Sequence, residues 1–158
     1  MFVSSLVYAN DRYFISFSLA QNGNVLQRGS DYVTSRPGVW NSGQTHSYLK
    51  LQCEKNKSGK LVKLFSTVTH FDGVRLTHRL VGDQIEVNVL WSEVKNRRAE
   101  IHKLGENECS SLSPIVTTIT QSYTFPANIG VVDIQPFGET MNFKLAIESG
   151  GKMRVVNN

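Results

Sequence analysis

Alternation of apolar and polar residues is clearest between Leu61 and Trp91. This stretch contains three apolar-rich runs, which are separated by Asp72-Gly73 and Gly82-Asp83. Glycine tolerates the positive φ that primed two-residue turns require, so both dipeptides favour tight β-hairpins. Counting outward from two such turns places the apolar residues of all three runs on one face. The stretch therefore predicts a three-stranded antiparallel meander, with Arg79 opposite Glu86 on its other face.

The same count assigns partners to individual side chains of the meander. It pairs Phe65 with Leu80 across the first turn, and it turns His78 inward beside Thr67 and Thr69. We expect His78 to be a core histidine that hydrogen-bonds a threonine hydroxyl. The alternative is that Thr67, Thr69 and His78 line an internal pocket for a small ligand.

Period-two alternation and β-branched residues predict further strands outside this stretch. They are expected at residues 12–21, 25–28, 46–53, 97–104, 115–125, 131–134, 141–147 and 153–156. No segment keeps an apolar period of 3.6 over three turns, so no helix is expected. Eight to ten short strands in one domain, residues 1–158, predict an all-β antiparallel sandwich, with a closed β-barrel as the alternative.

The two cysteines bear on the compartment in which the protein works. Cys53 is expected on the inward side of a strand, and Cys109 in a loop at residues 105–113. An even pair in an all-β chain predicts one disulfide and hence a periplasmic or secreted protein. Two free thiols in a cytoplasmic protein are the alternative. Residues 1–9 are apolar and are interpreted as the remnant of a signal peptide or as a first strand.

Composition excludes several classes of protein. The 158 residues are 40% hydrophobic and 19% charged, which is typical of a globular chain. No apolar run approaches the roughly 20 residues that a membrane-spanning helix needs. The common hydrolase, metalloprotease and nucleotide-binding motifs are absent, and the four histidines have no triad spacing. We therefore expect no enzymatic activity, no cofactor and no metal.

The segment from Asp31 to Thr45 is the best candidate for partner binding. It is expected to be an irregular loop, because Pro37 cannot donate to a β-ladder. Tyr32, Arg36 and Trp40 lie within it, and these residue types dominate binding hot spots. The alternative is that Trp40 folds back and caps the sandwich.

Basic residues form a second candidate surface. They fall into a lysine group around one turn (Lys55, Lys57, Lys60 and Lys63) and an exterior strand surface (Arg75, Arg79, Arg97 and Arg98). With a net charge of +4, this surface could bind a polyanion. Aromatic residues are not interleaved with the basic ones, so nucleic acid is a disfavoured partner. Charged exterior strands also discourage edge-to-edge pairing, which is the structural alternative.

These patterns together predict a non-enzymatic, exported β-sandwich that binds another protein. Docking would use the Trp40 segment, or strand addition at an edge such as the Val25 or Val155 strand. A component of a bacterial envelope assembly, such as a pilus or secretion apparatus, fits this description by analogy of class. The alternatives are a small-ligand carrier with a pocket near His78 and a polyanion binder.

Overall fold

The computed structural model describes residues 12–149, and this part of the chain contains strands and turns but no helix. The eight strands are β1 (Tyr13–Gln21), β2 (Asn24–Val33), β3 (Gly38–Lys55), β4 (Leu61–Val81), β5 (Gln84–Leu104), β6 (Asn107–Pro126), β7 (Val132–Phe137) and β8 (Met141–Ser149). The all-β prediction is confirmed.

Four strands form an open antiparallel sheet in the order β2-β1-β8-β7. In β1 the alternate residues Ile15, Phe17 and Leu19 are buried, and in β8 every second residue from Met141 to Ile147 is buried. Period-two patterning therefore turns one face of this sheet to the core, as the sequence predicts. Strand β2, which contains Val25, is one edge of the sheet.

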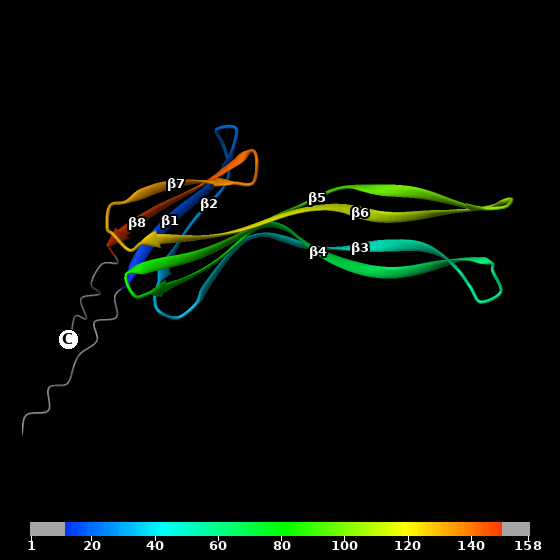
Figure 1. The fold of residues 1–158 in the computed structure, drawn as a ribbon, viewed down its shortest axis with the longest axis horizontal. Coiled ribbons are helices and arrows are strands. Elements are labelled where there is room, and N and C mark those ends of the chain that lie inside the picture. The colour runs from blue at the N-terminus through cyan, green and yellow to red at the C-terminus, as the bar shows by residue number, and fades with distance from the viewer. Residues whose placement is uncertain (1–11, 150–158) are drawn as a thin grey trace, which may run out of the picture. The chain divides into compact units, whose positions relative to one another are not determined.

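The other four strands follow one another through hairpins, and β3 returns to β6 at the registered pair Leu51 and Leu112. The two antiparallel sheets pack against each other, with the first sheet crossing the ends of β4, β5 and β6 (Figure 1). Because the first sheet is open, the architecture is the predicted sandwich rather than a single closed barrel.

The chain divides into two compact units, and each is described by itself. Within the described residues, unit 1 comprises residues 12–40, 76–89 and 121–149, and unit 2 comprises residues 41–75 and 90–120. Each of the four long strands contributes residues to both units. The aromatic and aliphatic core belongs to unit 1. It includes Ile15, Phe17, Leu19, Val33, Leu76, Ile85, Val87, Val89, Phe125, Phe137, Met141, Phe143, Leu145 and Ile147.

The turn predicted at Asp72-Gly73 is wrong, because β4 runs through it without interruption. Gly73 has a φ of 143°, far from the value near 60° that a primed turn requires. Its backbone instead lies against β3: a Cβ on Gly43 would approach the Gly73 Cα to 2.7 Å. Phe65 therefore cannot face Leu80 across a hairpin, and its side chain is 63% exposed.

The second turn of the predicted meander is confirmed. Gly82 has a φ of 62° in the turn that joins β4 to β5. Across this hairpin Arg79 Nε donates to Glu86 Oε2 at 2.6 Å, as the count from the turn requires.

Two predicted loops are strands instead. The segment from Asp31 to Thr45 is almost entirely extended, since β2 continues to Val33 and β3 begins at Gly38. Pro37 precedes β3, so its missing N–H interrupts no ladder. Cys109 lies within β6, because the turn occupies only residues 105–106. The candidate segments 1–9 and 153–156 lie outside the described residues.

Candidate binding surfaces

Trp40 is a packing residue of unit 1. Its ring meets the Phe17 ring edge-on at a centroid distance of 4.7 Å. It also lies against the Gly29 backbone, where a Cβ would collide with the indole. Aromatic pairs in this geometry stabilise a core beyond the area they bury. These contacts agree with the interpretation in which Trp40 folds back onto the sandwich instead of projecting toward a partner.

Tyr32 and Arg36 do not join Trp40 in one cluster. Tyr32 packs edge-on against Phe14 at 5.2 Å, and Phe14 lies on the opposite face of β1 from Phe17. Arg36 is exposed in the turn before β3, where its backbone N–H bonds Thr34 Oγ1 at 3.2 Å. Tyr32, Arg36 and Trp40 therefore have different contacts and do not form one cluster of hot-spot residues.

The candidate arginines are separated in the same way. Arg79 belongs to unit 1 and pairs with Glu86, whereas Arg75, Arg97 and Arg98 belong to unit 2. Arg75 Nε donates to Asn41 Oδ1 at 2.9 Å, and Arg98 Nε lies 3.4 Å from Glu100 Oε1. The Arg97 side chain is outside what the structure describes. Arg75, Arg79 and Arg98 therefore each already have a polar partner within their own unit.

His78 is buried in unit 1, but its partner is a carboxylate. Its Nε2 donates to Asp31 Oδ2 at 2.9 Å, and its imidazole packs against the Gly38 backbone. No hydrogen-bond partner for Nδ1 is found within the described residues. The predicted threonine partner is wrong, because β2 brings Asp31 to this position and Thr67 and Thr69 belong to unit 2.

A shallow groove of about 340 Å³ does open beside His78, but Thr67 and Thr69 do not line it. One wall is Tyr123, whose hydroxyl donates to the Pro136 carbonyl at 2.7 Å. Burial raises the pKa of Tyr123 to about 12, because the phenolate would lose its hydration. The neighbouring exterior positions include the paired Arg79 and Glu86, so this groove presents few free charges.

Unit 2 has little core of its own. Of the side chains described there, only Val74, Ser92 and Cys109 are buried. A disulfide joins Cys53 in β3 to Cys109 in β6, which confirms the predicted pairing. Other large apolar side chains of this unit, such as Phe71, Trp91 and Ile119, are half-buried, and five are exposed. The exposed ones are Leu49, Leu64, Phe65, Ile101 and Ile115.

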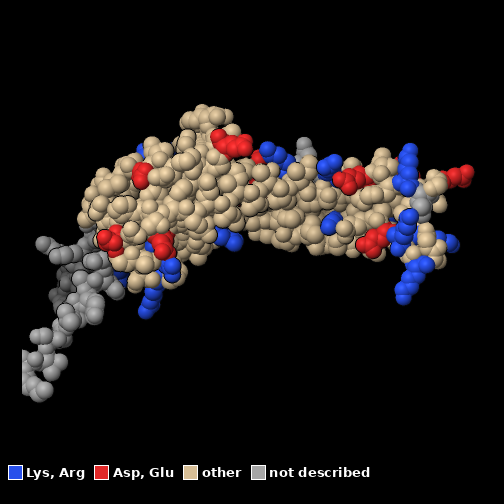
Figure 2. All heavy atoms as spheres, in the orientation of Figure 1, with Lys and Arg blue, Asp and Glu red and all other residues tan. Residues whose placement is uncertain are grey.

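The net charge of the chain is concentrated in the same unit. Residues 41–75 and 90–120 carry ten Lys and Arg against six Asp and Glu, and the rest of the chain carries seven of each. Residues 41–75 alone hold six basic and two acidic residues. Lys and Arg side chains gather around the hairpin ends of this unit (Figure 2). A hollow of about 350 Å³ there is lined by Lys60, Lys63 and Glu108 among others.

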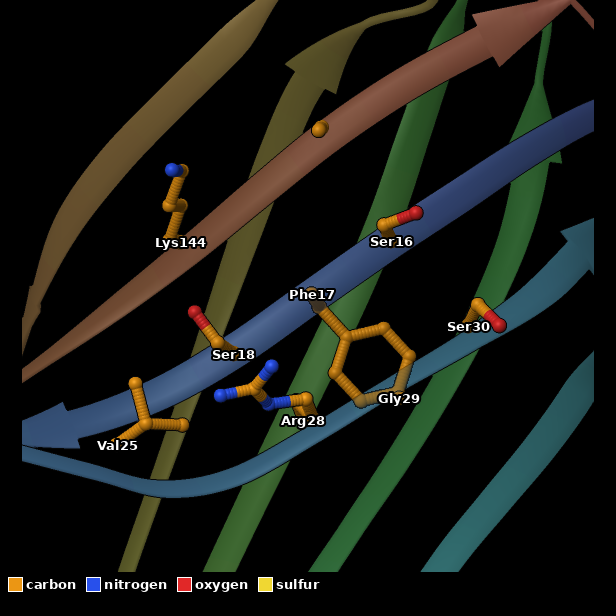
Figure 3. Close-up of a pocket in the computed structure, with 9 residues that line it drawn as sticks. Ser16, Phe17, Ser18, Val25, Arg28, Gly29, Ser30 and Lys144 are labelled. Carbon is orange, nitrogen blue, oxygen red and sulfur yellow. The ribbon is translucent and has the colours of Figure 1, made fainter.

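The outward face of the unit 1 sheet carries a third surface, which the strand register organises in rows. One row contains Arg28, Ser18, Lys144 and Ile134, and the next contains Ser30, Ser16, Ala146 and Val132. The small side chains leave a groove of about 570 Å³ between the larger ones (Figure 3). We call this hollow the Ser18 groove.

Sequence reasoning missed the Ser18 groove for a clear reason. The alternation of residues 13–19 predicts that Ser16 and Ser18 face outward. The basic residues beside them are Arg28 in β2, which follows β1 directly, and Lys144 in β8, which lies more than a hundred residues further along the chain. A sequence pattern fixes which face a residue occupies, but not which distant strand lies alongside.

Comparison of the chain with protein-family models, curated proteins and solved structures found no match. Across residues 12–149, no helix has the length and apolar character to cross a membrane. The same residues contain no group of three or more His, Cys, Asp or Glu arranged to hold a metal ion. The function must therefore be argued from the surfaces themselves.

Proposed function

We propose that this chain is a non-enzymatic protein-binding module that docks its partner through unit 2. The observation that carries the proposal is the contrast between burial and exposure there. Five large apolar side chains on the four long strands face solvent, while only Val74, Ser92 and Cys109 are fully buried among the side chains described in this unit. Contiguous exposed apolar surface marks interaction sites in folded proteins, and we propose that these side chains form such a surface.

Charge indicates what kind of surface the partner presents. The exposed Leu49, Leu64 and Phe65 lie in residues 41–75, the segment with six basic and two acidic residues. If the partner were a second copy of this chain docking through the same surface, two positively charged segments would meet and repel each other. An acidic protein surface would instead match it, speed association and favour the correct orientation.

The proposal includes an oxidising compartment, because a disulfide persists in periplasmic or secreted proteins and is rare in the cytosol. A component of an extracytoplasmic assembly, such as a pilus or secretion apparatus, is the setting that we propose. Protein purified from its native host should then contain no free thiol when it is denatured without reductant. Two free thiols would contradict the compartment.

The binding proposal is tested by photo-crosslinking in the native host. A photoreactive amino acid is placed at Leu64, and we expect one discrete crosslinked product. Phe65→Ser should abolish the product, because it removes a 63% exposed aromatic side chain beside the crosslinker. Replacing Lys60 and Lys63 by Glu should weaken it by reversing the local charge.

The matched control is Ile129→Ser in unit 1, because Ile129 is 64% exposed and belongs to the other unit. This variant should crosslink as the wild type does. Crosslinking that survives Phe65→Ser, or that is lost equally in Ile129→Ser, would contradict docking through unit 2. A product that contains a polyanion instead of a protein would favour the alternative of a polyanion binder.

A further inference from the structure

All residues that line the Ser18 groove belong to unit 1, and none of them carries the proposed docking function. Its floor consists of the small side chains of Ser16, Ser18, Ser30 and Ala146. Residues in one row of a sheet point to the same side, so Arg28 and Lys144 flank Ser18 on that side. Two strand spacings separate their Cα atoms by roughly 9.5 Å.

These two cations have no ion-pair partner within residues 12–149. The described ion pairs of the chain involve other side chains. Glu148 is on the same outward face, but it lies four residues beyond Lys144 on β8, which is roughly 13 Å along the strand. The groove is therefore locally positive and is not neutralised by its neighbours.

The donors suit an oxyanion with two negative charges. The Arg28 guanidinium, which lies beside Ser18 in Figure 3, presents paired N–H groups that match phosphoryl oxygens. Lys144 stands on β8 as an exposed, flexible point charge that can swing toward the same oxygens. The hydroxyls of Ser16, Ser18 and Ser30 add further donors.

The rim of the groove is apolar. Val25 lines it, and Ile134 and Val132 continue its two rows onto β7, where both side chains are more than half exposed. A volume of about 570 Å³ also exceeds what a bare phosphate fills and falls in the usual range of ligand sites.

We propose that the Ser18 groove binds a phosphoryl group carried by an apolar body, as in a phosphorylated lipid. Arg28 holds the phosphoryl oxygens, Lys144 supplies the second positive charge, and the aliphatic rim receives the apolar part. This site is independent of docking through unit 2.

The test is a ¹H–¹⁵N NMR titration of the full chain with its disulfide intact. The probes are dihexanoyl phosphatidic acid, glycerol 3-phosphate and dihexanoyl phosphatidylcholine, all below the concentrations at which the lipids form micelles. We expect phosphatidic acid to shift the amides of residues 16–18, 28–30 and 144–146. Glycerol 3-phosphate should shift the same amides at higher concentration, and phosphatidylcholine should shift them little.

The decisive variant is R28A combined with K144A, which removes both charges from exposed positions. Affinity for phosphatidic acid should fall by about tenfold or more, since charge-assisted bidentate contacts are lost. Lys57→Ala with Lys60→Ala removes the same charge from unit 2 and should leave the affinity unchanged.

Three outcomes would overturn the proposal, and a fourth would overturn its apolar part. One is the absence of shifts in these strands with any probe, and another is equal affinity in the R28A/K144A variant. The third concerns the ligand: if phosphatidylcholine, a zwitterionic phosphodiester, binds as well as phosphatidic acid, the two cations do not select a doubly negative phosphate monoester. If glycerol 3-phosphate binds as tightly as phosphatidic acid, the groove does not require an apolar part, and the ligand is a soluble phosphate ester.

Discussion

At the scale of single residues, His78 determines what its neighbours can be. The imidazole is buried, is held at Nε2 by Asp31, and has the Gly38 backbone directly against it. Fixed on one side by a hydrogen bond and on the other by main chain, the ring has little freedom to move aside. A glycine is required at position 38 for this close approach rather than for turn geometry.

Gly38→Ala should therefore destabilise unit 1. The new Cβ would collide with Cε1 of the His78 ring and would come within 2.9 Å of Nε2. Overpacking of a filled interior costs about 1–3 kcal/mol, and we expect a loss in that range in urea denaturation. Ser35→Ala, at an exposed position in the preceding turn, serves as the control and should change stability little. Equal stability of the two variants would mean that the ring relocates freely.

At the scale of elements, the sequence predicts strands better than it predicts their limits. Strands such as β1 and β8 were recognisable because one face is buried, which imposes period two. The glycines at positions 73 and 82 look alike in sequence, each beside an aspartate. Gly82 closes a hairpin, whereas Gly73 allows β3 and β4 to approach each other closely. Only the partner strand distinguishes these roles, and local patterning does not contain it.

We expect the disulfide to make a large contribution to the stability of unit 2. Cys53 and Cys109 are 56 residues apart, and few other side chains in this unit are buried. A loop of this length corresponds to about 4 kcal/mol in the chain-entropy account of disulfide stabilisation. Replacing both cysteines by alanine should therefore expose the hairpin turns at residues 56–60 and 105–106 to limited proteolysis.

The same variant should leave unit 1 resistant to the protease, because its core does not include the disulfide. Cleavage is followed by mass spectrometry of the fragments. If the wild type and the variant are cut at the same rate in unit 2, strand pairing alone maintains that unit. Loss of resistance in both units at once would mean that they unfold cooperatively.

At the scale of the whole molecule, the candidate surfaces could be anticipated only in part. The period-two pattern of β1 predicts that Ser16 and Ser18 face outward. Counting residues outward from the turn at Gly82 predicts the pairing of Arg79 with Glu86, which the structure shows. The Ser18 groove depends on β1 pairing with β8, and the proposed docking surface depends on unit 2 having few fully buried side chains. Both are consequences of long-range topology, in which strands far apart in sequence meet. Local alternation is compatible with many such topologies.

The unequal division of the core has a consequence for stability across the molecule. Amides of β1 and β8, whose inward side chains are fully packed, should exchange with solvent only through global unfolding. The side chains at residues 61–71 and 107–118 are nearly all exposed or half-buried, so the amides there should exchange at least about tenfold faster through local opening. Hydrogen exchange of the native, oxidised chain followed by NMR measures both sets at once. Because a docked partner would cover unit 2, its binding should slow exchange there and leave β1 and β8 unchanged. If the two sets of amides exchange at the same rate in the free chain, unit 2 is as stable as unit 1 and does not depend on a partner for its stability.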